Sequence, residues 1–225
     1  MQLQNRHIEL KNISLSYDNR VVLRDINLTL NRGDFMLVTG ANGGGKTSLI
    51  RVMLGLQKPS IGRVLYYDSG VAKNYLKDVK SERVGYLPQK NSLDMRFPIS
   101  VREVIESGLV KMRRELTKEE CRNKVSEMLQ YMQLDLLQDR QIGEVSGGQF
   151  QRALFARTII SNPTLLVLDE PTSYLDREYT QKIYTILQQS LPQTSIVMVS
   201  HDTHQVIDMA NRIIEVDRGC VIEKS

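Results

Sequence analysis

Residues 40–47 read Gly-Ala-Asn-Gly-Gly-Gly-Lys-Thr, and this stretch decides how the rest of the sequence is interpreted. It fits the phosphate-loop pattern of two glycines separated by four residues and followed by a lysine and a hydroxyl residue. The apolar run 35–39 precedes it and a helical pattern, 46–54, follows it. Glycines let a backbone wrap closely around phosphates, and the N–H groups at the helix start then face the anion. We therefore predict a phosphate-binding turn between a buried strand and a helix.

The side chains of this motif indicate how a nucleotide would be held. Lys46 is expected to reach the β- and γ-phosphates, and the Thr47 hydroxyl is expected to bind Mg²⁺. A glycine-rich turn without chemical meaning is the alternative, which the length and the context of the motif disfavour. The other expected nucleotide contacts are Gly40, Asn42, Gly43, Gly44, Gly45 and Ser48.

A second candidate segment is the apolar run 165–168, which ends in Asp169 and Glu170. Ligands of α/β proteins bind at the carboxyl ends of the strands, so both acids would emerge beside the phosphate loop. Asp169 fits a Mg²⁺ ligand, and Glu170 fits the base that polarises the attacking water. An ordinary strand ending in a solvated turn would look the same.

The pattern around these two segments predicts an α/β fold. Strand and helix patterns alternate, which indicates a mostly parallel sheet with helices on both faces. The alternating runs 7–17 and 21–30 predict an antiparallel β subdomain at the amino terminus. We expect one domain over residues 1–225: a phosphate-loop NTPase core, 1–90 and 146–225, and an inserted helical subdomain at about 91–145.

Local signals refine this outline. In the helical subdomain, Ser100 with Glu103 and Thr117 with Glu120 are possible capping boxes. Residues 69–83 are polar and poorly periodic, which predicts a loop, and residues 202–210 are predicted to be helical.

Composition excludes several function classes. The 30 basic and 26 acidic residues give a net charge of +4 without a long basic run, so nucleic acid is not an expected partner. Cys121 and Cys220 lie far apart, which disfavours a disulfide framework or a zinc ribbon. No apolar stretch approaches the roughly 18 residues of a membrane span, and residues 1–11 lack the apolar core of a signal peptide. We expect a cytoplasmic chain that reaches a membrane only through another subunit.

Residues Ser146-Gly147-Gly148-Gln149 resemble the signature motif of ABC ATPases, with Val145 where leucine is usual. Four residues alone would fit any helix start, but further motifs follow in the family's order across essentially the whole chain. The matching positions are an aromatic that stacks on adenine (Tyr17), the Q-loop glutamine (Gln89), the D-loop 173–176 with Tyr174 where alanine is usual, and the switch histidine (His201).

The resemblance implies an ATP-hydrolysing subunit that works as a head-to-tail homodimer around two ATP molecules with Mg²⁺. It makes Glu170, His201, Gln89 and Lys46 catalytic, and adds Gln89 to the Mg²⁺ ligands Thr47 and Asp169. Ser146, Gly148 and Gln149 would contact the nucleotide of the opposite subunit. The implied partners are a membrane permease and, indirectly, a periplasmic or extracellular substrate-binding protein, which would hold the chain on the inner face of the membrane.

The cargo is indicated only by similarity. The segment 94–101 and the three glycines before Lys46 resemble ATPases of zinc and manganese importers, whereas 101–104 is also similar to iron-chelate importers. ABC ATPases that act without transport, in cofactor assembly or as cell-envelope scaffolds, are a further alternative. A metal site formed by His201, Asp202, His204 and Asp208 is a competing interpretation of the last histidine motif.

Overall fold

The computed structural model describes residues 5–18, 20–74, 83–89, 95–191, 193–201 and 204–224. Backbone contacts divide the chain into two compact units. The first unit comprises Met1–Glu82 with Leu187–Ser225, and the second comprises Arg83–Ile186.

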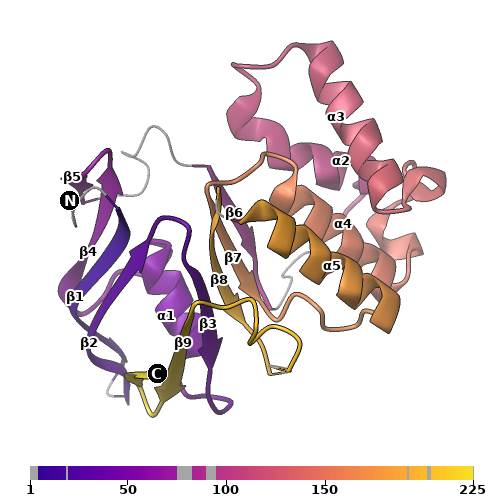
Figure 1. Ribbon diagram of the computed structural model, residues 1–225. Helices are drawn as coiled ribbons and strands as arrows, with labels where there is room; N and C mark the ends of the chain where they lie inside the picture. The colour runs from indigo at the N-terminus through magenta and orange to yellow at the C-terminus, as the bar shows by residue number, and fades with distance from the viewer. Residues whose placement is uncertain are drawn as a thin grey trace. The chain divides into compact units, whose positions relative to one another are not determined.

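The first unit contains the predicted antiparallel sheet, with strand order β2-β1-β4-β5 (Figure 1). From Ile13 on β1 and from Ile26 on β2, buried side chains alternate with more exposed ones, as expected of a sheet with one face on the core, whereas residues 7–10 of β1 are all buried. The short strand β5 lies inside the segment predicted as a loop, because three residues are too few to show a period. The bounds are β1 (Arg6–Tyr17), β2 (Arg20–Asn31), β4 (Ile61–Asp68) and β5 (Val71–Lys73).

The same unit contains parallel strands around β3 (Phe35–Thr39). This strand pairs in parallel with β8 (Ser195–Val199) and with β9 (Arg212–Asp217). Strands β3 and β8 are almost wholly buried, which explains why their sequences are continuous apolar runs. The helix α1 (Lys46–Met53) follows β3 and packs against β2, and β10 (Cys220–Lys224) closes a hairpin with β9.

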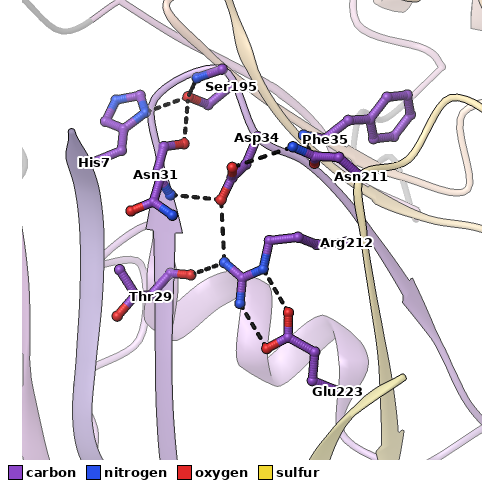
Figure 2. Close-up of polar contacts among 10 residues, drawn as sticks. His7, Thr29, Asn31, Asp34, Phe35, Ser195, Asn211, Arg212 and Glu223 are labelled. Carbon is purple, nitrogen blue, oxygen red and sulfur yellow. Dashed lines mark hydrogen bonds and ion pairs between the residues drawn. The ribbon is translucent and has the colours of Figure 1, made fainter. Parts of the chain in front are cut away.

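A polar network joins the strands of the first unit near the start of β3 (Figure 2). The carboxylate of Asp34 accepts hydrogen bonds from Asn31 N at 2.8 Å and from Arg212 Nη1 at 3.2 Å. Arg212 also donates to both carboxylate oxygens of Glu223, from Nε at 2.7 Å and from Nη2 at 2.9 Å. This bidentate contact lowers the pKa of Glu223 below its ordinary value. The network thus links β2, β9 and β10 to the residue that precedes β3.

Ser195 extends the network to the antiparallel sheet (Figure 2). Its hydroxyl accepts from Gly33 N at 3.0 Å and lies 2.7 Å from Nδ1 of His7 on β1. Both His7 and Ser195 are buried, at 2% exposure each, so the contact satisfies polar atoms that water does not reach. The two sheets of the first unit are therefore joined by hydrogen bonds as well as by apolar packing.

The second unit combines two parallel strands with helices (Figure 1). Strand β6 (Val84–Leu87) pairs in parallel with β7 (Leu165–Asp169), and α4 (Gly147–Ile159) packs on β6 and on α2. Both predicted capping boxes are present, at the starts of α2 and α3. The other bounds are α2 (Val101–Glu106), η2 (Ser107–Met112), α3 (Lys118–Tyr131), η3 (Asp135–Leu137), η4 (Ile142–Glu144) and α5 (Arg177–Ser190), whose residues from Leu187 on are counted with the first unit.

One predicted helix is wrong in its described part. Residues 204–209 form turns, and their hydrogen bonds include Met209 N and Ala210 N to the same carbonyl, Val206 O. Two hydrogen bonds to one carbonyl close a single turn, whereas a helix needs hydrogen bonds from successive N–H groups to successive carbonyls. No helix within the described ranges is both long and apolar enough to cross a membrane.

Candidate nucleotide-binding site

The phosphate loop of the first unit is shaped by close backbone approaches. Gly40 has φ 126, and a Cβ added there would lie 2.1 Å from the carbonyl oxygen of Val216 on β9. Gly45 has φ 114, and its added Cβ would lie 3.0 Å from Val22 O on β2. Only glycine tolerates both the conformation and the contact. The strands on either side therefore fix the course of the loop, which the local sequence alone could not show.

Lys46 is the charged group of this loop. Its side chain is buried, at 7% exposure, and Nζ donates to Gly40 O at 2.7 Å and to Ala41 O at 3.0 Å. Gly45 is the N-cap of α1 and has no side chain to satisfy the first N–H groups of the helix. A buried ammonium and an open helix start together attract a multivalent anion. This is the chemistry that the sequence predicted for a phosphate group.

The remaining predicted positions of the first unit lie in the phosphate loop, in the first turn of α1 or at the ends of strands. Asn42 and Gly43 are exposed at the tip of the loop, whereas Thr47 and Ser48 are half-buried in the first turn of α1. Tyr17 ends β1 with 41% of its surface exposed, and His201 is exposed two residues after β8 ends.

The second unit brings Gln89 to the same sheet edge as Asp169 and Glu170. Leu87 and Leu168 are paired in the parallel register, so both strands end side by side (Figure 1). Asp169 is the last residue of β7 and is only 1% exposed, while Gln89 is exposed two residues beyond β6. The three oxygen-bearing side chains thus follow neighbouring strand ends within the second unit, and the place of the two acids beside the phosphate loop stays a prediction.

The turn after β7 holds Glu170 in a specific backbone conformation. Its φ is 55, an uncommon value for a residue with a side chain. Ser173 N donates to its carbonyl at 3.3 Å, and Ser173 Oγ donates to Oε2 at 3.4 Å. Backbone outliers of this kind concentrate at functional sites, since the surrounding structure must enforce them.

The signature motif begins α4 with a reciprocal cap. Gln149 N donates to Ser146 Oγ at 3.2 Å, and Ser146 N donates to Gln149 Oε1 at 2.9 Å. A Cβ added at Gly147 would meet no atom within 4 Å in the described part of the chain, whereas one at Gly148 would lie 3.2 Å from Tyr174 O. The signature motif and the D-loop are therefore neighbours, and Tyr174, at φ 69, is 85% exposed beside them.

One buried residue of this region was missed by sequence reasoning. Gln151 of α4 is 7% exposed, and its Nε2 donates to Pro171 O at 3.2 Å. The bond ties the signature helix to the turn that carries Glu170. Its only sequence signal was a polar residue among the apolar positions of the helix.

The predicted site residues divide between the two units. Tyr17, the phosphate loop with Lys46 and Thr47, and His201 belong to the first unit. Gln89, Asp169, Glu170 and the signature motif belong to the second. Among the described residues, no three His, Cys, Asp or Glu side chains form a metal-binding group; Asp202 of the competing metal-site interpretation lies outside those residues.

Comparison with known proteins agrees with this geometry. The family model described as ABC transporter matches residues 23–173, and the chain belongs to that family. Membership confirms the predicted family, the α/β fold class and the class of ATP-hydrolysing cassettes.

Particular relatives match nearly the whole chain. The zinc import ATP-binding protein ZnuC of Ehrlichia chaffeensis is 32% identical, over 99% of this chain and 85% of its own length. ZnuC of Pasteurella multocida is 35% identical, over 92% of this chain and 72% of its own. A solved ATP-binding cassette in a dimeric, post-hydrolysis state with ADP and Pi is 27% identical, with a TM-score of 0.83 over 97% of this chain and 98% of its own.

Proposed function

We propose that this chain binds and hydrolyses ATP as the nucleotide-binding subunit of a zinc importer, working as a homodimer on a separate membrane permease. The observation that carries the ATPase part is the phosphate loop, where the buried Lys46 ammonium sits against loop carbonyls at an open helix start. The cargo part is supported by relatives at 32% and 35% identity that are named zinc import ATP-binding proteins.

In the first unit, Lys46 neutralises the β- and γ-phosphates of ATP while the backbone of the loop surrounds them. The N–H groups from Gly40 to Ser48, including those of Asn42, Gly43, Gly44 and Gly45, supply the cradle. Tyr17 stacks on adenine, a role consistent with its exposure at the end of β1.

Mg²⁺ fits the donor set that we assign to it. Thr47, Gln89 and Asp169 offer hydroxyl, amide and carboxylate oxygens, the hard ligands that Mg²⁺ prefers. When bound, the ion would offset the negative charge of the β- and γ-phosphates.

Hydrolysis is then a matter of positioning and electrostatics. Glu170 orients the attacking water and takes its proton, in the turn that Ser173 stabilises. His201 and Gln89 contact the reacting end of the nucleotide and stabilise the charge that spreads over the transferring phosphoryl group.

Each site is completed by a second copy of the chain. The cap between Ser146 and Gln149 satisfies two polar groups at the start of α4 and leaves the small residues Gly147 and Gly148 as the natural approach for a phosphate. Ser146, Gly148 and Gln149 therefore contact the nucleotide held by the other subunit. The dimeric state of the solved cassette at 27% identity supports this arrangement.

A groove in the second unit suits the permease. It has a volume of about 310 Å³, and it is bordered by β6, η2 and the end of α4. Val110 is 58% exposed at its edge, beside the basic residues Lys111 and Arg157. We assign this groove to a cytoplasmic helix of the permease, which would hold the chain at the inner face of the membrane; a periplasmic or extracellular substrate-binding protein would act on the permease from the other side.

The catalytic assignment is tested with Glu170→Gln, which keeps the size of the side chain and removes its basicity. We expect ATP hydrolysis to fall by about 10²–10⁴ because the water loses its base. ATP binding should survive, and size-exclusion chromatography with Mg-ATP should show an accumulated dimer.

Adding Ser146→Arg to this variant should abolish the dimer, since the arginine would occupy the approach to the partner's nucleotide. Arg114→Gln, at an exposed position outside the assigned sites, serves as the control. Hydrolysis by Glu170→Gln at the wild-type rate would disprove the assignment of the base.

The cargo is tested by deleting the gene and limiting metals with a chelator. Growth should fail under zinc limitation and be restored by added zinc or by the intact gene, but not by the Lys46→Ala gene. A defect confined to iron-chelate sources would instead support the iron-chelate alternative.

A further inference from the structure

A second cavity, of about 740 Å³, lies in the second unit between α2, α3 and the segment that joins them. None of its residues belongs to the nucleotide motifs or to the 310 Å³ groove. The lining consists of Arg102, Glu106, Arg113, Leu116, Lys118, Cys121, Arg122 and Val125.

The lining is strongly basic. It contains four cations and one carboxylate, an excess of three positive charges, in a chain whose total net charge is +4. Arg113 Nη2 lies 3.4 Å from Glu106 Oε1, and Arg102 Nη2 donates to the neutral side chain of Gln138. Because the lining contains four cations and only one carboxylate, a bound anion would relieve the repulsion among the cations.

Two helices and the segment between them converge on this cavity. Lys118, Cys121, Arg122 and Val125 follow the helical spacing of one face of α3, while Arg102 and Glu106 are one turn apart on α2. A basic face on a single helix would be an ordinary solvated surface. Here the basic side chains surround a hollow whose floor includes Val125, which is 1% exposed.

The capping boxes hold the starts of both helices in place. At α2, Ser100 N donates to Glu103 Oε2 at 2.8 Å, and at α3, Thr117 N donates to Glu120 Oε2 at 2.7 Å. The carboxylate of Glu120 is thereby used at the helix start, and it is not part of the cavity lining. The cationic groups are thus presented by ordered backbone rather than by a loose tail.

We propose that this cavity binds a phosphate-bearing small molecule with an apolar part, at a site separate from the phosphate loop. Guanidinium groups match phosphate oxygens in a bidentate fashion, and three arginines with one lysine favour more than one negative charge. Leu116, Cys121 and Val125 offer an apolar surface to the rest of the ligand. The volume falls within the range of small-molecule sites, roughly 300–1,000 Å³.

The chain contains its own reporter for this site. It has two cysteines: Cys121 lines the cavity, and Cys220 lies on β10 in the other unit. Occupation of the cavity should slow the alkylation of Cys121 by iodoacetamide and leave that of Cys220 unchanged. Mass spectrometry of the two cysteine peptides gives both rates in one sample.

The experiment has two arms that distinguish the sources of the phosphate group. One uses adenosine 3′,5′-bisphosphate as a soluble probe, and the other uses phosphatidylglycerol vesicles, with phosphatidylcholine vesicles as the reference. Both arms are run on the Lys46→Ala chain, so that binding at the phosphate loop does not contribute. Alkylation of Cys121 that is at least fivefold slower with either probe than in its reference sample supports the site. Rates that match the reference sample in both arms overturn it.

Charge reversal tests the assigned residues. The double variant Arg113→Glu with Arg122→Glu should remove the protection, because both exposed side chains line the cavity. Arg114→Glu is the matched control, an exposed neighbour outside the lining, and should keep it. If Arg114→Glu removed the protection of Cys121 to the same extent, nonspecific attraction of the anion to a basic surface would explain the result and the site would be overturned. The single reversals give the same readout if the double variant lacks native circular dichroism. In the chain that keeps Lys46, none of the arginine variants should change the basal ATPase rate.

Discussion

The starts of α1 and α4 both contain small residues, yet they are built differently. Helix α1 begins at Gly45, which has positive φ and no side chain, and α4 begins at Ser146 with a complete capping box. The loop before α1 is pressed against the backbones of β9 and β2, whereas Gly147 faces open space in the described part of the chain. Strands of its own unit thus hold the loop before the first helix, whereas the described residues leave space at Gly147, where we propose that the partner's nucleotide binds.

The largest expected effect of this difference is on nucleotide affinity. Lys46→Ala should weaken ATP binding by about 100-fold or more, because a charged, desolvated contact to phosphate is lost. Ser146→Ala should leave the affinity of a single chain unchanged, since its motif serves the nucleotide of the other subunit. Isothermal titration calorimetry measures both, with the exposed Lys58→Ala as control. Comparable losses of ATP affinity in Lys46→Ala and Ser146→Ala would contradict the proposed difference between the starts of α1 and α4.

A middle-sized effect is expected on stability. Gly40→Ala should destabilise the chain by about 2–3 kcal/mol, because its Cβ would meet a backbone carbonyl at 2.1 Å and its φ is positive. Gly147→Ala should change stability by about 1 kcal/mol or less, and in the stabilising direction, since alanine favours the helix. Urea unfolding followed by circular dichroism compares the two. Equal destabilisation by the two substitutions would contradict the contrast between a crowded Gly40 and an uncrowded Gly147.

The smallest effect is expected for the polar network of Asp34, Arg212 and Glu223, which connects strands of the first unit. Arg212 lowers the pKa of Glu223, so the carboxylate stabilises the fold above its ordinary pKa of 4.5 and loses this contribution as the pH falls through the lowered value. Glu223→Gln should reduce stability near neutral pH by about 1 kcal/mol or less, because the glutamate is half exposed.

The same variant should also flatten the acid dependence of unfolding. Between pH 5 and 3 the wild-type chain should lose more stability than Glu223→Gln, as measured by urea unfolding at each pH. Glu178→Gln, an exposed position in the first turn of α5, is the control. Identical pH profiles for wild type and Glu223→Gln would exclude the role of this ion pair.

Sequence reasoning was most successful where the signal is local. The capping boxes at Ser100 and Thr117 involve residues three positions apart, so their pattern is visible in the sequence and both are present. It failed for the helix predicted over 202–210, since the described residues 204–209 form turns. The strand β5 was missed because its pairing with β4 depends on tertiary position rather than on period.

The sequence by itself determined the phosphate loop between a buried strand and a helix and the acids after a second buried strand, because each rests on contiguous residues. It also determined the family, because short motifs follow one another in a fixed order along the chain. Only the tertiary structure decided which backbones press on Gly40 and Gly45, that Tyr174 O lies against Gly148, and that Gln151 reaches Pro171. It also gathered the basic side chains of α2 and α3 around one cavity. These contacts join residues that are distant along the chain. Such contacts have no regular sequence separation, so a sequence pattern cannot predict them.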